Sequence, residues 1–312
     1  MSNLEKSTED YLSRVNSVIL YIEENLDKTL NLDVISCHAN FSPFHFHRIF
    51  TALQGETPAD FILRLRTEKA ARLLLEDKKI PIVEIAYRCG FSNQTSFSRA
   101  FRKCFGMTAH EFRKQKKAVF SSNRQFFNSL GELVERTDTS INNKQIDSFA
   151  LENVTFIKNP YICMKRMPKF EVAYLPYTGD FYEIGNTYTT LFDWANQNQL
   201  FDSHSTRFFT IYHDDPTITK FEKNRQSVCI TIPNNIKPKG KIGKRIIPEG
   251  KYLVGSFDLS DTEYDKAWNT MYLTVIEKCY KLRDASIYEM YEAKDNNLFS
   301  QPYKVFMCLP IE

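Results

Sequence analysis

Along the first 120 residues, apolar side chains recur at intervals of three and four, the spacing of amphipathic helices. One such helix is predicted over residues 11–26, and residues 59–76 form a longer one that is rich in strong helix formers. Between them, Asn31 and the pair Ser42-Pro43 mark two helix starts. A side-chain oxygen at such a start can accept an unpaired N–H, and proline has no N–H to leave unpaired.

A second set of start and stop signals follows residue 80. Pro81 opens a short helix, Gly90 allows a turn of positive φ, and Ser92 is the expected cap of a helix that ends at Gly106. A closing helix, basic toward its end, is predicted over residues 109–117. The order of short helix, turn and longer helix therefore occurs twice.

The two occurrences are also alike residue by residue. LDVISCHANF, which starts at Leu32, aligns without a gap with IVEIAYRCGF, which starts at Ile82. After one inserted residue the aligned pairs are Arg48/Arg99, Phe50/Phe101, Gly55/Gly106, Thr57/Thr108 and Phe61/Phe112. Repetition at a fixed period indicates a duplicated unit. A short helix, a turn and a longer capped helix form a helix-turn-helix, whose second helix enters a DNA groove. DNA binding is therefore the leading hypothesis.

Helical phase separates core positions from outward ones in each unit. The expected core residues are Phe46, Ile49, Phe50 and Leu53 in the first unit and Phe97, Ala100, Phe101 and Phe105 in the second. The outward side chains near the start of each longer helix are candidates for base contacts, since Gln can pair with adenine and Arg with guanine. They are Phe44, His45, His47, Arg48, Gln94, Thr95, Ser96, Ser98 and Arg99. Arg102, Lys103, Lys114 and Lys116 are better placed for phosphates.

The distribution of charge agrees with this hypothesis. Residues 41–120 hold 15 Lys and Arg against 7 Asp and Glu, and the rest of the chain holds 26 against 31. A basic region joined to an acidic one is typical of a nucleic-acid-binding part fused to a part with another task. The 312 residues predict two domains, and without a membrane span or a signal pattern we expect a soluble, cytoplasmic protein. Its seven scattered cysteines are expected to be reduced.

After residue 150 the pattern changes. Strands are predicted over residues 170–175, 228–232, 252–257, 287–291 and 305–309, and helices over residues 182–197 and 262–278. The order of strand, helix and two strands, given twice, suggests a second and weaker duplication. Residues 118–150 are polar and rich in Ser, Asn and Thr, as in a linker. We therefore expect an all-α domain over residues 8–117, this linker, and an α+β domain over residues 151–312.

By these marks the first domain resembles the DNA-binding domain of the AraC family of transcription regulators, in the Rob-like arrangement. The closing segment IVEIAYRCGFSNQTSFSRAFRKCFGMTAHEFRK is the most specific match. The resemblance implies seven helices and one monomer whose two recognition helices enter successive major-groove segments, about 34 Å apart. It places base contacts at Phe44, His47, Arg48, Gln94, Thr95, Ser98 and Arg99. Phe44 departs from the tryptophan or polar residue often found at its position, which leaves the base preference of the first unit open.

The sequence does not favour metal binding or nucleophilic catalysis. Cys37, His38, His45 and His47 could suggest zinc, but His45 and His47 point roughly opposite ways on a helix and Cys37 aligns with Tyr87, which we interpret as a packing position. In the second half there is no nucleotide-binding loop or nucleophile elbow, and neither His204 nor His213 has an obvious nucleophile nearby. We expect no metal and no cofactor.

One carboxylate in the second half is a candidate ligand contact. In IYEMY, strand alternation puts Glu289 and Tyr291 on one face. With Tyr174 and Trp268 they would form a carboxylate in an aromatic setting, which suits a cationic lipophilic ligand. The alternative is that Glu289 lies exposed on a wet sheet face.

This half also resembles the GyrI-like effector-binding domain. The matching stretches are FEVAYLPYTGDFYEIG, YHDDP, IPEGKYLVGSF, AWNTMY, IYEMY and CLPIE. The resemblance implies two strand-helix-strand-strand halves around a cleft, with the pocket glutamate at Glu289. Gln226-Ser227 stands where the family pattern has an acidic residue, so the details of ligand binding do not transfer directly.

Three roles for the second domain stay open. It could sense a small molecule and alter the binding of double-stranded DNA by the first domain, which is not expected to contact membranes. It could be a hydrolase that uses Glu289 as acid and base, or a docking module for a protein such as RNA polymerase or gyrase. We favour the sensor, in a multidomain regulator that is not an enzyme.

Overall fold

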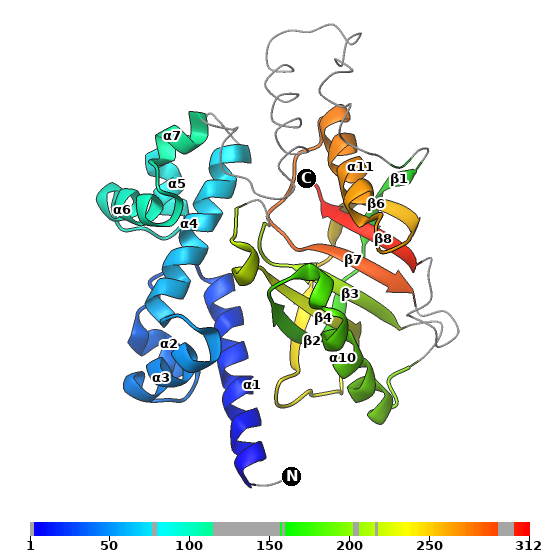
Figure 1. Ribbon diagram of the computed structural model, residues 1–312, viewed down its shortest axis with the longest axis horizontal. Coiled ribbons are helices and arrows are strands. Elements are labelled where there is room, and N and C mark those ends of the chain that lie inside the picture. The colour runs from blue at the N-terminus through cyan, green and yellow to red at the C-terminus, as the bar shows by residue number, and fades with distance from the viewer. Residues whose placement is uncertain are drawn as a thin grey trace, which may run out of the picture. The chain divides into compact units, whose positions relative to one another are not determined.

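The computed structural model describes residues 3–76, 80–114, 157, 160–201, 206–215, 218–292 and 303–312. These residues form two compact units, one built mainly from the N-terminal part of the chain and one mainly from the C-terminal part (Figure 1). The expected linker, residues 118–150, lies outside the described residues, as do His204 and Lys116.

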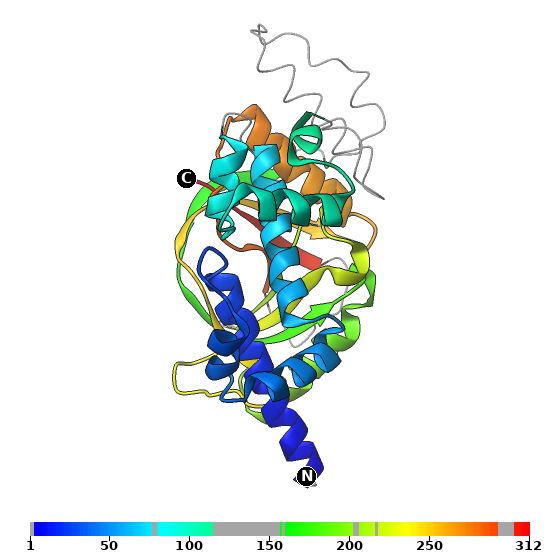
Figure 2. The same ribbon diagram turned by 90° about the vertical axis from the view of Figure 1, so that its left-hand side faces the viewer.

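The N-terminal unit is all helical, as expected. Among the described residues its helices are α1 (Asn3–Glu24), α2 (Leu32–His38), α3 (Pro43–Gln54), α4 (Pro58–Glu76), α5 (Ile82–Arg88), α6 (Gln94–Phe105) and α7 (Ala109–Lys114). The first helix-turn-helix unit is α2 with α3, and the second is α5 with α6. Helix α4 contacts members of both units and runs between them (Figure 2).

The local signals for these helices act mostly as the sequence predicts. The side chains of Asn31 and Ser42 accept hydrogen bonds from the N–H groups of Val34 and His45. Gly55 and Gly106 end α3 and α6 with φ of 66° and 72°. The expectation of a Ser92 cap is wrong. Helix α6 is capped by Asn93, whose Oδ1 accepts from the Ser96 N–H at 2.8 Å. Asn93 falls where the second unit has its one inserted residue, so the cap moved with the insertion.

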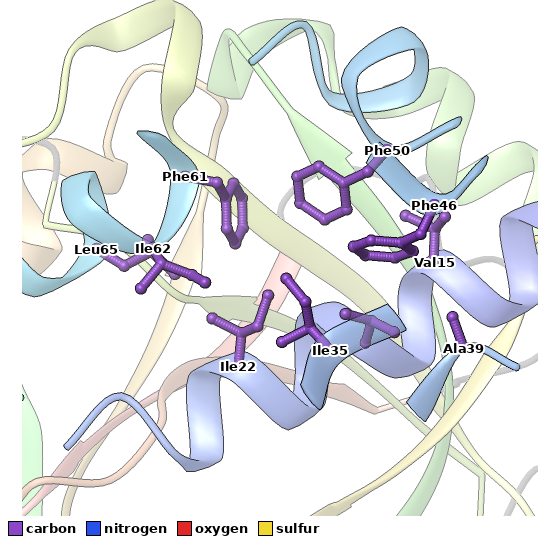
Figure 3. Packing of buried hydrophobic residues seen from close by; sticks show 10 residues of the cluster. Val15, Ile22, Ile35, Ala39, Phe46, Phe50, Phe61, Ile62 and Leu65 are labelled. Atoms are coloured by element: carbon purple, nitrogen blue, oxygen red, sulfur yellow. The ribbon is translucent and has the colours of Figure 1, made fainter. Parts of the chain in front are cut away.

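Each helix-turn-helix unit has an aromatic core. In the first, Phe46 and Phe50 of α3 pack with Ile35 of α2 and with α1 and α4 residues such as Ile22 and Phe61 (Figure 3). All five side chains are at most 1% exposed. Full burial of such a side chain stabilises the fold by roughly 1.5–3 kcal/mol.

The second unit repeats this core. Phe97 and Phe101 are fully buried, and Phe101 makes an edge contact with Phe112 at a centroid distance of 5.4 Å. Leu53, expected in the first core, is instead 40% exposed. Its aligned position in the second unit, Cys104, is also exposed, so this position faces away from the core in both longer helices.

The C-terminal unit is an antiparallel sheet with two helices. Its strands are β1 (Tyr161–Met167), β2 (Phe170–Thr178), β3 (Arg207–Tyr212), β4 (Arg225–Thr231), β5 (Gly243–Ile247), β6 (Gly250–Leu259), β7 (Ile287–Glu292) and β8 (Tyr303–Pro310). The helices are α10 (Gly185–Gln197), preceded by the short 3₁₀ turn η1 (Phe181–Glu183), and α11 (Tyr264–Glu277); a second such turn, η2 (Phe221–Lys223), precedes β4.

The strand order β1-β6-β8-β7-β3-β4-β2-β5 confirms the second duplication. The halves β2-α10-β3-β4 and β6-α11-β7-β8 each follow the order of strand, helix and two strands. From the central pair β7 and β3 outward, the strand order is β7-β8-β6 on one side and β3-β4-β2 on the other. This is the order expected for two halves related by a local two-fold axis. The two halves therefore meet where Thr210 of β3 pairs directly with Glu289 of β7.

Both helices lie on the sheet face that carries Thr210 and Glu289. Tyr188 of α10 bonds to Thr210, and Trp268 of α11 bonds to Glu289. Beneath α11, Met271 and Val275 pack with strand residues of this face in one hydrophobic cluster. A Cβ at Gly255 of β6 would lie 2.4 Å from the Met271 sulfur, so this glycine allows the close approach of α11.

Three strands were not predicted from the sequence. β3, which the duplication requires, has its four central residues buried and so lacks the alternation of a half-exposed strand. β1 and β5 lie at the two edges of the sheet and are rich in Lys and Arg. Such composition is common on edge strands, where charge opposes unwanted pairing, but it obscures the strand signal.

Candidate DNA-reading helices and a candidate ligand site

The start of α3 presents a mainly exposed surface. Phe44 is 74% exposed, and His47 and Arg48 are exposed as well. The guanidinium of Arg48 lies over the Phe44 ring, 5.8 Å from its centroid, a cation–π arrangement. This helix therefore offers one large apolar group and one bidentate donor side by side.

The start of α6 is more polar. Gln94, Thr95, Ser98 and Arg99 are all exposed, while the neighbouring Phe97 and Ala100 are buried. Ser96 is only partly exposed, and its hydroxyl donates to the Asn93 carbonyl at 2.8 Å. The structure thus groups four of the five candidate readers of this helix on its outer surface, and Ser96 helps to close the first turn.

The candidate histidine and cysteine cluster is divided among separate contacts. His45 makes edge contacts with the rings of Tyr11 and Phe41. His38 stacks on Tyr21 at a centroid distance of 4.4 Å. Within the described residues, no three or more His, Cys, Asp or Glu side chains gather in a geometry that could hold a metal ion. Cys37 and Tyr87 are both exposed, so the interpretation of that position as a packing position is wrong.

The candidate phosphate contacts lie around α6 and α7. Arg102 and Lys114 are exposed. Lys103 is exposed too and lies 3.4 Å from Asp60 of α4, an ion pair of small energetic value because water screens it. These basic groups remain available for contacts with a polyanion.

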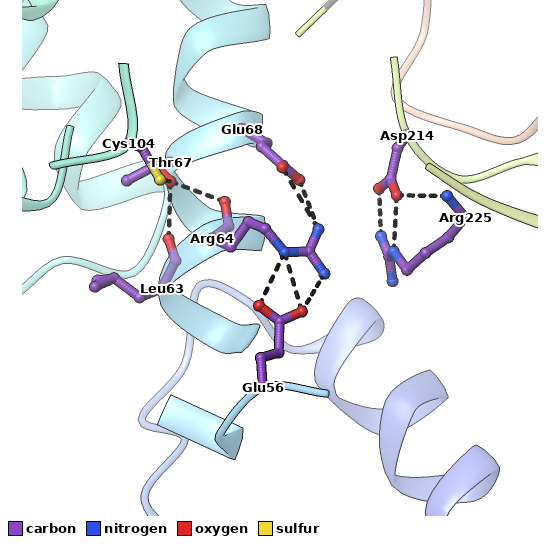
Figure 4. A network of polar contacts seen from close by, with 8 residues as sticks. All are labelled: Glu56, Leu63, Arg64, Thr67, Glu68, Cys104, Asp214 and Arg225. Carbon is purple, nitrogen blue, oxygen red and sulfur yellow. Dashed lines mark hydrogen bonds and ion pairs between the residues drawn. The ribbon is translucent and has the colours of Figure 1, made fainter. Parts of the chain in front are cut away.

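Two partly buried arginines of α4 make polar contacts around this helix. Arg64 forms hydrogen-bonded ion pairs with Glu56 at 2.7 Å and with Glu68 at 3.2 Å (Figure 4). Arg66 reaches the chain after α1, where its Nε and Nη2 donate to the carbonyls of Leu26 and Lys28 at 2.9 and 2.5 Å.

The turn of the second helix-turn-helix unit, between α5 and α6, lies against Arg66 and Leu26. A Cβ at Gly90 would lie 2.2 Å from the Leu26 carbonyl oxygen and 2.9 Å from the Arg66 guanidinium. Gly90 also has a φ of 78°, which disfavours other residues. Three segments therefore converge here: the end of the α1 region, the middle of α4, and the turn between α5 and α6.

In the C-terminal unit, Glu289 is completely buried. Its Oε1 accepts from Trp268 Nε1 at 2.8 Å, and its Oε2 accepts from the Tyr291 hydroxyl at 2.7 Å. The Tyr212 hydroxyl faces the same carboxylate without a hydrogen bond of regular geometry. Burial raises the pKa of Glu289 to about 7, against the lowering effect of these donors. Among the described residues these donors are all neutral aromatic side chains, so no cation offsets the buried charge.

Aromatic rings surround the carboxylate. Tyr212 makes an edge contact with Trp268 at 5.8 Å, and Tyr291 makes one with Tyr188 at 6.2 Å. Each contact joins a strand of one half of the domain to the helix of the other half. These four side chains are partly exposed, whereas Glu289 and Thr210 beneath them are 0% and 2% exposed. We call these six residues the Glu289 site.

The structure keeps Glu289, Tyr291 and Trp268 of the expected ligand set together but separates Tyr174. The register of β2, β4 and β3 places Tyr174 opposite Cys229 and Phe209, on the other face of the sheet. There Arg245 lies over its ring at 5.8 Å. The sequence showed the alternation within each strand but not which faces of different strands coincide, so Tyr174 could not be assigned to a face.

The expectation that His213 has no nucleophile nearby is wrong. Its Nε2 lies 2.7 Å from the Ser227 hydroxyl and 3.3 Å from Arg245 Nη1. Burial and then the neighbouring arginines lower the pKa of His213, so the ring is neutral and can accept these bonds. Ser227 is only 1% exposed. We therefore interpret His213 and Ser227 as a buried pair with a structural role.

Nearby, Asp214 and Arg225 form a second buried pair, with Arg225 Nε 2.9 Å from the carboxylate (Figure 4).

In the described parts of the chain, no helix is both long and apolar enough to cross a membrane.

Comparison with known proteins bears on both units. A helix-turn-helix domain model matches residues 35–115. The probable transcriptional regulator LumQ of Photobacterium leiognathi is 37% identical over 102 residues, which cover 32% of this chain and 41% of LumQ. The TetD protein of transposon Tn10 from Escherichia coli is 38% identical over 102 residues, covering 33% of this chain and 73% of TetD. This chain belongs to the AraC family of helix-turn-helix regulators. Its helical unit is thus an AraC-type DNA-binding domain.

The C-terminal unit matches the GyrI-like small molecule binding domain over residues 162–312. The expected combination of an all-α AraC-type domain and an α+β GyrI-like domain is thereby confirmed. A solved structure of the regulator EcmrR with DNA aligns with 90% of this AraC-family chain and 98% of its own, at 14% identity and a TM-score of 0.41. The sequence match covers about two-fifths of LumQ. It therefore shows similarity to the DNA-binding domain and not to the whole of that regulator.

Proposed function

We propose that this AraC-family protein regulates transcription by binding a specific DNA site as a monomer. Helices α3 and α6 would enter successive major-groove segments. The observation that carries the proposal is the duplicated unit with an exposed helix start in each copy, together with the exposed basic residues of α6 and α7. Phe44, His47, Arg48, Gln94, Thr95, Ser98 and Arg99 are the proposed base contacts. Arg102, Lys103 and Lys114 are the proposed phosphate contacts.

Two substitutions test this assignment. With a site selected from random DNA, Arg99→Ala should cost about 1–3 kcal/mol at one base position, as expected for the loss of a bidentate contact. Lys114→Ala should weaken all sequences about equally and reduce the dependence of affinity on salt by about one phosphate contact. If both variants weaken every sequence equally, the division into base and phosphate contacts is incorrect.

We further propose that the GyrI-like domain binds a small lipophilic cation at the Glu289 site. A buried carboxyl without a cationic partner among the described residues, ringed by partly exposed aromatic side chains, supports this ligand class. A cation binds the ionised carboxyl, and the pKa of Glu289 is about 7. The affinity should therefore rise about tenfold per pH unit up to pH 7 and level off above it. A pH-independent affinity would contradict the role of Glu289.

Ligand binding is expected to change the affinity for DNA, and DNA must then change the affinity for the ligand by the same factor. Titrating the full-length protein with ligand in the presence and absence of its DNA site measures this coupling. A saturating ligand that leaves DNA affinity unchanged would exclude the sensor role. A docking role toward a protein such as RNA polymerase would then be tested by pull-down without ligand.

A second candidate function rests on the pKa of Glu289. A carboxyl group with a pKa of about 7 can act as general acid and base near neutral pH. The domain would then hydrolyse an electrophilic substrate, and turnover would be lost in Glu289→Gln. Binding of a ligand in a fixed ratio without any product would favour the sensor.

A further inference from the structure

The Glu289 site lies on the local two-fold axis of the duplicated domain, so each half contributes an equivalent set of positions. Thr210 of β3 and Glu289 of β7 face each other across the central strand pair. Two residues further along each strand come Tyr212 and Tyr291. The helix of each half adds one aromatic group, Tyr188 or Trp268. Duplication therefore supplied two matching positions at the centre, and only one of them carries a charge.

The hydrogen bonds follow the same two-fold scheme. Trp268 donates to Glu289 at 2.8 Å, and in the other half the Tyr188 hydroxyl and Thr210 Oγ1 are 2.5 Å apart. Of the two hydrogens in that hydroxyl pair, only one is used in the bond between them. The second hydrogen and the unused oxygen lone pairs remain. The Thr210–Tyr188 pair can therefore act as donor or acceptor toward another group.

The distance between the two centres limits what that group can be. Directly opposed residues on neighbouring antiparallel strands have Cβ atoms roughly 5 Å apart. A ligand whose positive charge lies on Glu289 would reach Thr210 only with an atom a few bonds from the charge. A second charge there would have no carboxylate to oppose it. An apolar group would leave the second hydrogen of the hydroxyl pair without an acceptor next to Thr210, which is 2% exposed.

We infer that the Thr210–Tyr188 hydroxyl pair is a second recognition point of the Glu289 site. It would select organic cations that carry a hydroxyl or similar oxygen about three bonds from the charged nitrogen. This inference rests on the proposed cation-binding function and adds to it the chemical class of the ligand. Thr210 and Tyr188 are specificity-determining residues in this scheme, and Glu289 provides the charge complement.

Two ligands that differ in one group test the inference. Benzyl(2-hydroxyethyl)dimethylammonium and benzyldimethyl(propyl)ammonium have the same charge and nearly the same shape, but a hydroxyl in the first replaces a methyl in the second. Calorimetric titration of the full-length protein should give about 3- to 10-fold tighter binding of the hydroxyl ligand, as for one added hydrogen bond. The double variant Thr210→Val/Tyr188→Phe nearly preserves shape and should bring the two affinities within twofold.

Thr189→Val is the matched control, because Thr189 is exposed on α10 and its hydroxyl bonds to the Gly185 carbonyl. It should keep the preference of the unmodified protein. Thermal melts establish that each variant is folded, and the single variants Tyr188→Phe and Thr210→Val give the same readout should the double variant not fold.

The outcomes separate the two proposals. If both ligands bind equally to the unmodified protein, or if the preference survives in the double variant, the role of the hydroxyl pair is overturned while cation binding stands. If neither ligand binds at millimolar concentration, or if Glu289→Gln leaves both affinities unchanged, cation binding at Glu289 fails and the inference fails with it.

Discussion

The two units of this protein each contain a duplication, and the copies have diverged in opposite places. In the DNA-binding domain the aromatic core is kept, with Phe46 and Phe50 matched by Phe97 and Phe101, while the exposed side chains at the starts of the two longer helices differ. In the GyrI-like domain the order of strands and helices is kept, and the decisive difference, Thr210 opposite Glu289, lies at the buried centre.

This contrast follows from where each duplication makes its contacts. Two helix-turn-helix units that lie side by side on DNA each need a core of their own, and each can present different side chains to different bases. Two half-domains that share one sheet meet at a common interior, so a change at their junction alters a single site. Divergence on the surface can diversify DNA reading, whereas divergence at the junction creates one asymmetric buried site.

Exchanging residues between the aligned turns should produce the largest effect. Asn40 and Gly90 occupy the same turn position with φ of 53° and 78°. Asn40→Gly should change the free energy of unfolding by less than about 1 kcal/mol. Gly90→Asn should cost about 3 kcal/mol or more, because its Cβ would lie 2.2 Å from the Leu26 carbonyl oxygen, a clash with backbone that no side-chain movement relieves. Urea unfolding of both variants measures the difference, and equal costs would show that the copies are interchangeable there.

The junction of the GyrI-like halves offers the next largest effect. In Glu289→Gln the buried charge is removed while most of the shape is kept. Burial raises the pKa of Glu289 from 4.5 to about 7, so between these values the unfolded chain loses a proton that the folded chain retains. Stability due to this group therefore falls as pH rises through this window. The variant should match the original protein near pH 4.5 and exceed it by up to about 3 kcal/mol at pH 8.

Thermal unfolding from pH 4.5 to 8 measures this gain. Glu263→Gln is the control, since that carboxyl has its pKa lowered by bonds from Ser260, so its removal should give no gain at high pH. A constant difference between Glu289→Gln and the original protein at all pH values would mean that Glu289 does not titrate in this range.

The sequence predicts the first duplication better than the second, for a physical reason. Helix caps, glycine stops and core positions are local signals, so the aligned pairs identify both helix-turn-helix units and their outward residues. Sheet pairing is not local. The edge strands β1 and β5, the fully buried β3, and the face on which Tyr174 lies all depend on which strands become neighbours. Strand alternation and aromatic density are local signals, so they point to Glu289 and Trp268 as ligand candidates. Thr210 lies on the unpredicted strand β3, so the sequence did not indicate it.

The two helix-turn-helix units are not independent of each other, because Arg66 contacts segments next to both. This residue of α4 bonds to the Leu26 and Lys28 carbonyls and touches the Gly90 turn. We predict that these contacts help to set the distance between α3 and α6. In Arg66→Met both bonds are lost, which should weaken binding to the selected DNA site by about 1–2 kcal/mol.

The more telling measurement is discrimination between spacings. Adding one base pair between the half-sites turns the second major groove by roughly a tenth of a helical turn. A rigid frame should penalise this strongly, whereas Arg66→Met should reduce the ratio of affinities for the original and the lengthened site severalfold. Arg88→Gln, which removes an exposed ion pair with Glu84, should leave the ratio unchanged. If the ratio is the same in all three proteins, the spacing is set by the α4 helix itself, and Arg66 contributes only to stability.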